Sequence, residues 1–167
     1  DVLPLSFDYG LYQVFMTFLF GGTVVIEPSF TFPVRILKLL EDERVTGFPV
    51  IPTFCAILEK LRLFREGVFP NVRYVTNTGA ALPMNAIYSL ERSFPNARIF
   101  SMYGLTECKR ISYLPPEEIL SRPMSVGKAM PNCEIWLEDE NGNRLPNGSS
   151  GELMVREGEA APHVGNR

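Results

Sequence analysis

The sequence predicts an α/β fold, with a mostly parallel sheet and flanking helices, followed by a small β-rich C-terminal portion. In residues 1–115, apolar segments with helical spacing alternate with short β-branched runs, which is typical of successive βα units. Residues 116–156 are richer in proline and polar residues and contain two further strand-like runs around an Asn-Gly pair. The last segment, residues 157–167, lacks any periodicity, and we expect an irregular tail there.

The composition is that of an ordinary globular protein. The 167 residues are 46% hydrophobic and 21% charged, which is sufficient for one sizeable core. The net charge is -3 and no basic stripe is visible, which argues against a nucleic-acid-binding protein. The three cysteines are scattered and His163 is the only histidine, so we expect neither a structural zinc site nor Ser-His-Asp or Cys-His catalysis. The odd cysteine count suits a reducing, cytoplasmic setting.

Residues 11–26 are the only stretch that suggests a membrane span. The stretch is shorter than the roughly 20 apolar residues that a span needs, and it contains Gln13 and the pair Gly21-Gly22. We therefore expect no membrane span, but a buried helix followed by a strand.

The first half of the chain predicts three helices and two strands. An apolar helix covers residues 12–20, and a short β-branched strand follows at residues 23–26. Pro33 and Pro52 each begin a helix, because proline is favoured in the first helical turn, and residues 47–51 form a strand and turn between them.

The second half continues this alternation as far as about residue 115. We expect a strand at residues 72–76, a glycine-containing loop at 77–82, a helix at 83–94 and a strand at 97–102. Beyond them, residues 134–137 and 151–155 read as two strands that flank a turn at Asn141-Gly142. They predict a hairpin or small β-subdomain packed on the α/β part.

Three loops lie where α/β folds bind ligands, at strand ends or just before helices. In the first, residues 6–10, Asp8 has the simple interpretation of a helix N-cap. In the second, residues 77–83, small residues could let a flat ligand approach backbone N–H groups, although a tight strand–helix connection explains them equally well.

The third loop, residues 101–107, combines an aromatic ring, a glycine, a hydroxyl and a carboxylate. Tyr103 could stack on a flat base, Thr106 could donate to a phosphate oxygen, and Glu107 could bind Mg²⁺ through hard oxygen. The alternative is structural, with Tyr103 in the core, Thr106 as a cap and Glu107 in solvent.

Taken together, the three loops resemble the adenylate-forming superfamily, which includes acyl-CoA synthetases and the adenylation domains of peptide synthetases. Residues 103–107 match the Y-G-x-T-E segment of that family, and residues 77–83 resemble its Gly/Ala-rich adenine-binding segment. Residues 125–127 with Pro131, and later residues 151–153, resemble its S-V-G and G-E-L landmarks. The resemblance covers roughly residues 3–156.

The resemblance implies a role for each matching position. Thr106 and Glu107 would be catalytic, with Thr106 on the α-phosphate and Glu107 binding the magnesium ion. Tyr103 would stack on adenine. The implied nucleotide-binding residues are Gly79, Ala80, Ala81, Tyr103, Gly104 and Thr106, and the implied substrate-binding residues are Phe7, Asp8, Gly79, Gly104 and Leu105.

Phe7 and Asp8 bear on the substrate class. Peptide-synthetase adenylation domains often have S-F-D here, with the aspartate pairing with the α-amine of an amino acid. Other features, including residues 113–117, look like a bacterial acyl-CoA ligase subgroup. Asp8 is therefore either an amine receptor or a helix cap, because a buried carboxylate facing a hydrocarbon acid would be costly unless well hydrogen-bonded.

The implied reaction joins a carboxylate and MgATP into an acyl-adenylate and pyrophosphate, and then transfers the acyl group to a thiol. The thiol is that of coenzyme A or of a carrier protein's phosphopantetheine. Ligation to coenzyme A, in fatty acid metabolism, is the first expectation, and adenylation of an amino acid for a carrier protein is the alternative. A second alternative is a non-catalytic binding or structural module with the same fold.

The resemblance also implies segments that this sequence lacks. They are a Ser/Thr/Gly-rich phosphate loop before Leu3, a downstream aspartate for the ribose hydroxyls, and a C-terminal domain with a catalytic lysine. We therefore expect the chain to be an internal fragment of a longer enzyme, and to be inactive alone.

Overall fold

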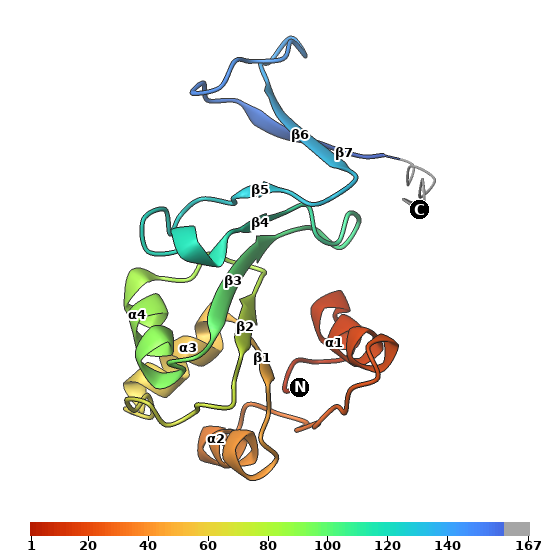
Figure 1. The fold of residues 1–167 in the computed structure, drawn as a ribbon. Coiled ribbons are helices and arrows are strands. Elements are labelled where there is room, and N and C mark those ends of the chain that lie inside the picture. Colours follow the sequence, from red (N-terminus) through yellow and green to blue (C-terminus); the bar gives the residue numbers. More distant parts are fainter. Residues whose placement is uncertain (159–167) are drawn as a thin grey trace, which may run out of the picture.

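The computed structural model describes residues 1–158 as a five-stranded sheet with helices on both sides and a separate two-stranded sheet (Figure 1). The predicted tail, residues 157–167, lies mostly outside the described residues. The elements in chain order are α1 (Asp8–Leu19), α2 (Pro33–Asp42), β1 (Gly47–Val50), α3 (Pro52–Lys60), β2 (Tyr74–Asn77), α4 (Met84–Ser93), β3 (Arg98–Tyr103), β4 (Ser112–Leu114), the short 3₁₀ turn η1 (Pro116–Glu118), β5 (Lys128–Ala129), β6 (Cys133–Glu138) and β7 (Glu152–Glu157).

The main sheet has the order β1-β2-β3-β4-β5. Strands β1, β2 and β3 are parallel, whereas β4 and β5 are antiparallel additions at one edge. The predicted α/β class with a parallel sheet is therefore confirmed for its first part. Strand β5 joins this sheet although its residues fall in the range 116–156.

The hydrophobic core lies between the sheet and helices α2, α3 and α4. It is centred on aromatic side chains, with Phe54 and Phe94 both about 1% exposed and Phe48 packed between their rings. Proline begins α2 and α3 at their first turn, as predicted. Each of these helices buries one apolar stripe, as an amphipathic surface helix should.

Helix α1 lies on the opposite side of the sheet from α3 and α4 (Figure 1). It was predicted to be a buried helix, and this is wrong: Gly10 is its only buried residue, and Phe15, Phe18 and Leu19 are exposed. No helix within residues 1–158 is long and apolar enough to cross a membrane.

The strand predicted at residues 23–26 is also wrong. This segment is extended, but its backbone pairs only with Asp1: the terminal ammonium donates to the carbonyl of Val25, and Glu27 N–H donates to the carbonyl of Asp1 at 2.9 Å. Within the described residues this is a single-residue contact and not a ladder. A β-branched run needs a neighbouring strand as well as propensity.

Strands β6 and β7 form the predicted hairpin, with a full antiparallel register from Cys133–Glu157 to Glu138–Glu152. Asn141-Gly142 makes the expected turn, which the Asp139 carboxylate closes by accepting the N–H groups of Asn141 and Asn143. The hairpin was expected to pack on the α/β part, but it projects beyond β5 and none of its strand residues is buried (Figure 1).

Candidate active site

The three predicted loops meet at one cavity of about 620 Å³. It lies between α1 and the carboxyl ends of β1, β2 and β3, which is where open α/β sheets bind ligands. Its walls include Phe7 and Asp8 from the start of α1, Gly79 from the loop after β2, and residues 104–106 from the loop after β3. Segments separated by about a hundred residues in the sequence thus form a single site.

The first loop presents an unpaired carboxylate to this cavity. The N-cap of α1 is Phe7, and Asp8 is the first helical residue, with no side-chain capping bond. Within residues 1–158, the Asp8 carboxylate forms no ion pair, and it is half-buried. The helix-cap interpretation of Asp8 is therefore wrong, and the carboxylate is left facing the cavity.

Tyr9 fixes the position of this loop relative to the sheet. Its hydroxyl donates to the carbonyl of Thr76 at 2.7 Å and lies 2.9 Å from the Thr76 hydroxyl. Burial raises the pKa of Tyr9 well above its ordinary value, so the phenol remains a protonated donor. The contact joins the start of α1 to β2, and so holds Asp8 at the strand ends.

The second loop contributes Thr78 and Gly79 to the cavity. Ala80 and Ala81 are exposed and do not line it. The fully buried Asn77 shapes the loop, because its side-chain amide donates to the carbonyl of Ala80 at 2.8 Å. Of the small residues predicted to contact ligand, only Gly79 therefore faces the site.

In the third loop, too, some of the predicted residues line the cavity and others do not. Gly104, Leu105 and Thr106 line the cavity, whereas Tyr103 and Glu107 do not. Tyr103 is half-buried at the end of β3, where its carbonyl accepts the N–H of Ile111 at 2.9 Å. Glu107 is exposed beside Thr106. The loop thus contributes Thr106 to the cavity wall, and the exposed Glu107 follows it in the sequence.

Gly104 is required by a close approach of the chain to itself. A side chain there would overlap the backbone carbonyl of Lys109 and would also touch the Cα of Arg110. The first obstacle to a side chain at Gly104 is therefore this crossing of the backbone. The crossing turns residues 109 and 110 back toward α1.

Lys109 and Arg110 are cavity residues that the sequence analysis missed. The Lys109 ammonium lies over the Tyr12 ring, 2.7 Å from its centroid, and the charge of Arg110 lowers the pKa of Tyr9, against the larger effect of burial. The available signal was the position of two adjacent cations one residue beyond the Y-G-x-T-E segment, after Cys108.

A comparison with protein-family models decides the family. The model described as AMP-binding enzyme matches residues 1–162, almost the whole chain. The chain belongs to the AMP-binding enzyme family.

Individual members of this family are similar in sequence and in structure. A D-alanine–D-alanyl carrier protein ligase from Bacillus velezensis is 30% identical over 158 residues, which are 91% of this chain and 31% of that protein. The structure of VinN in complex with L-aspartate matches with a TM-score of 0.80 at 33% identity, and covers 98% of this chain and 41% of that one. O-succinylbenzoate coenzyme A synthetase (MenE) from Bacillus subtilis, in complex with ATP and magnesium ion, matches with a TM-score of 0.79 at 28% identity, and covers 94% and 32%. This chain spans about a third of the length of the curated relatives that it matches.

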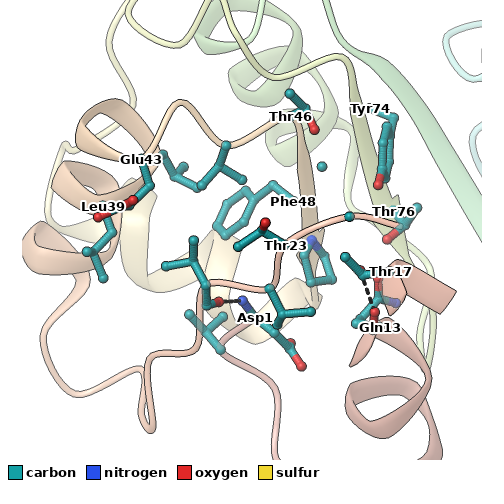
Figure 2. Close-up of a pocket in the computed structure, with 18 of the residues that line it drawn as sticks. Asp1, Gln13, Thr17, Thr23, Leu39, Glu43, Thr46, Phe48, Tyr74 and Thr76 are labelled. Atoms are coloured by element: carbon teal, nitrogen blue, oxygen red, sulfur yellow. Dashed lines mark hydrogen bonds between the residues drawn. The ribbon is translucent and has the colours of Figure 1, made fainter. Parts of the chain in front are cut away.

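A second, larger cavity of about 720 Å³ adjoins the first, and Met16 and Arg110 line both. It runs along β1, the outermost strand, and Figure 2 shows the hydroxyls of Thr23, Thr46 and Thr76 around it. None of the residues that resemble the motifs of AMP-binding enzymes lines this cavity. The motif residues therefore belong to the smaller cavity.

The magnesium ion expected for an AMP-binding enzyme fits the carboxylate donor that the third loop supplies. Within residues 1–158, no group of three or more His, Cys, Asp and Glu side chains could hold a metal ion. Magnesium, however, is commonly bound by one or two carboxylates together with substrate phosphates and water. The exposed Glu107 carboxylate, which forms no ion pair in the described part of the chain, is such a donor.

Proposed function

We propose that the protein containing this chain is an AMP-forming ligase that activates an amino acid and passes it to the thiol of a carrier protein. The observation that supports this most strongly is the unpaired Asp8 carboxylate in the cavity formed by the three motif loops. Coenzyme A ligation was the first expectation from sequence, and the surroundings of Asp8 favour the alternative.

The surroundings of Asp8 make a cationic ligand the natural partner. The cavity walls near α1 are largely apolar, with Leu3, Pro4 and Phe7 next to the carboxylate in sequence and Met16 two turns further along the helix. A carboxylate that loses water on ligand binding must gain a partner of equal strength. The α-ammonium of an amino acid supplies that partner, and it would bind with a charge-assisted hydrogen bond.

Two of the similar proteins agree with this substrate class. One is a ligase for D-alanine and the other is bound to L-aspartate. Both ligands have an amine beside the carboxylate, as a substrate for Asp8 requires.

The remaining motif residues fit the adenylation step. An oxygen of the substrate carboxylate attacks the α-phosphorus of ATP, the bond to pyrophosphate breaks, and an aminoacyl-adenylate is formed. Thr106 would donate its hydroxyl to an α-phosphate oxygen, where negative charge develops, and Tyr103 would stack on the adenine. Glu107 would hold a magnesium ion, which neutralises phosphate charge when bound.

The experiment is amino-acid-dependent ATP–pyrophosphate exchange, measured on the complete gene product. We expect exchange with amino acids and little with the same acids lacking the amine. In Asp8→Asn, the KM for the amino acid should rise by about 10- to 100-fold while the KM for ATP is unchanged. Exchange that is indifferent to the amine in both proteins would contradict the proposal.

Glu107→Gln tests the nucleotide side of the same site. We expect exchange to fall by about 10²- to 10³-fold, which is typical for removing one group that stabilises the transition state. The matched control is Glu117→Gln, an exposed carboxylate that pairs with Arg98 at 3.6 Å, away from the cavity. Equal losses in the two variants would remove Glu107 from the proposed machinery.

A second candidate is ligation of an amine-free acid to coenzyme A. The apolar walls of the cavity favour it, as does the similarity to a coenzyme A synthetase. Supplying the purified protein with either coenzyme A or phosphopantetheinylated carrier protein, and following AMP release, distinguishes the two acceptors. The free cysteines of the described chain suit a reducing cytoplasm as the setting for either reaction.

A further inference from the structure

We propose that the substrate of this site has a second carboxylate, which Lys109 and Arg110 bind. This inference rests on the proposed amino-acid ligase function and adds the substrate class, an amino acid with an acidic side chain or, more generally, an amino dicarboxylic acid. The observation is that both cations line the cavity that contains Asp8.

Neither cation has an anionic partner among residues 1–158. Across residues 1–158, the ion pairs involve other arginines and lysines, and none includes Lys109, Arg110 or Asp8. Lys109 instead rests on the Tyr12 ring, 2.7 Å from the centroid. A cation held by an aromatic face while facing a cavity remains available to an anionic ligand.

The backbone places these cations in a fixed position. Lys109 has a positive φ of 51°, which is uncommon for a residue with a side chain and costs about 1 kcal/mol or more. Packing against Gly104 maintains this conformation, because the chain crosses so closely there that no side chain fits. The two cations therefore follow directly from the loop that also presents Thr106.

Helix geometry relates Lys109 to Asp8. Tyr12 lies four residues after Asp8 in α1, so their side chains share one face and lie one turn apart. Lys109 over Tyr12 is thus one helical turn from Asp8, and the two do not form an ion pair. A ligand with an ammonium at Asp8 and a carboxylate at Lys109 fits this spacing.

The charges of the ligand can then be assigned to separate groups. The ammonium would bind Asp8, the reacting carboxylate would lie beside Thr106, and the second carboxylate would bind Lys109 and Arg110. Arg110 lines both cavities, so it lies at the boundary between them. Glu157 adds one more carboxylate to the walls, but it is exposed at the end of β7.

The cations could instead serve the nucleotide phosphates, but their neighbours argue against this. They share the cavity with Phe7, Asp8 and Leu105, which the resemblance assigns to the acyl substrate. Of the residues assigned to the nucleotide and magnesium, Ala80, Ala81, Tyr103 and Glu107 do not line the cavity, whereas Gly79, Gly104 and Thr106 do, so the KM for ATP is measured as well.

The test is pyrophosphate exchange by the complete gene product with aspartate and with asparagine, which differ only in the second carboxylate, and with glutamate and glutamine as a longer pair. We expect the acidic member to be preferred by at least about tenfold in one of the pairs. Lys109→Met should reduce that preference by about 10- to 100-fold, and Lys109→Arg should retain most of it. The matched control is Lys128→Met, which removes a lysine that also lies over a ring, that of Tyr113, but outside the cavity.

Each outcome separates this inference from the proposed function. Exchange with amino acids but without preference for the acidic member overturns the second-carboxylate site alone. A KM for ATP that rises in Lys109→Met while the preference persists assigns the cation to the nucleotide and also overturns it. Absence of exchange with every amino acid overturns the proposed function and this inference together. Near-UV circular dichroism of each variant, compared with Lys128→Met, separates lost recognition from lost folding.

Discussion

The role of Asp8 that the sequence suggests differs from the one that the structure supports. An aspartate just before an apolar helix is a common N-cap, and the pattern alone left that interpretation open. In the structure the backbone enters the helix one residue earlier, so Phe7 is the N-cap and the carboxylate of Asp8 has no capping bond. Because a carboxylate beside apolar walls needs a partner, its chemistry points to a ligand.

Cys55 makes a residue-scale prediction about stability. It is fully buried in the core, and desolvation raises the pKa of its thiol from 9.0 to about 12. The unfolded thiol therefore ionises first as the pH rises, while the folded thiol keeps its proton. Above about pH 9 the unfolded state binds fewer protons, so the free energy of unfolding should fall by about 1.4 kcal/mol per pH unit.

Urea unfolding between about pH 8 and about pH 10 measures this slope. Below pH 9 the Cys55 contribution is constant, and the buried Tyr9, whose pKa is also raised, adds a fall in the same direction only above its ordinary pKa of 10.0. Cys55→Ala should lower stability at every pH because it leaves a cavity, but it should flatten the slope between pH 9 and 10. An unchanged slope in Cys55→Ala would assign the alkaline loss to other groups.

At the scale of elements, the prolines that begin helices were the most informative feature of the sequence. Pro33 and Pro52 mark the starts of α2 and α3, because a ring-fixed φ and a missing N–H are tolerated in a first helical turn. The predicted strand at residues 23–26 does not form, because a strand needs a neighbouring strand and tertiary structure decides whether one is present. Within the described residues, its backbone pairs only with Asp1. The apolar pattern of α1 likewise does not reveal which of its sides is covered.

The loops of the site could be predicted from the sequence, but the presence of the cations Lys109 and Arg110 in the cavity could not. The Y-G-x-T-E segment and its glycine stand out in the sequence. The proximity of Lys109 to Tyr12 does not, because it depends on the chain crossing itself at Gly104. Such contacts arise from tertiary packing and have no sequence period to identify them.

Gly104→Ala tests this crossing. The added methyl would overlap backbone atoms of Lys109, which cannot move independently, so the loop from β3 to β4 must shift as a unit. We expect a loss of about 1–3 kcal/mol of stability, as for overpacking, together with a loss of exchange activity in the complete gene product, because Thr106 and Lys109 move with the loop.

The matched control for Gly104→Ala is Gly142→Ala in the hairpin turn. Gly142 has a φ of 80° and nothing within 4 Å of an added Cβ, so the substitution strains the backbone without any steric overlap. It should cost about 1–2 kcal/mol of stability while leaving exchange unchanged. Similar losses of exchange in the two variants would mean that general destabilisation, and not loop displacement, affects the activity.

At the scale of the whole molecule, the described residues form two parts, one with a buried core and one without. The five-stranded sheet has a continuous core, whereas β6 and β7 pair only with each other and none of their residues is fully buried. Figure 1 shows this hairpin projecting from the edge formed by β5. Two-stranded sheets are marginally stable alone, so the hairpin should open at a lower denaturant concentration than the rest.

The chain offers a direct reporter for this opening, because Trp136 in β6 is its only tryptophan. The guanidinium groups of Arg144 and Arg156 lie over its ring, 4.2 Å and 5.8 Å from the centroid, and both arginines pair with Glu134. Opening the hairpin separates these groups and exposes the indole to water.

In a urea titration, tryptophan fluorescence should therefore change before the far-ultraviolet circular dichroism of the helices is lost. Glu134→Gln should move the fluorescence transition to lower urea and leave the helical transition unchanged. Coincident transitions in both proteins would show that hairpin and core unfold as one cooperative unit. The hairpin would then be stabilised by contacts at its base, where Cys133 and Glu157 border the active-site cavity.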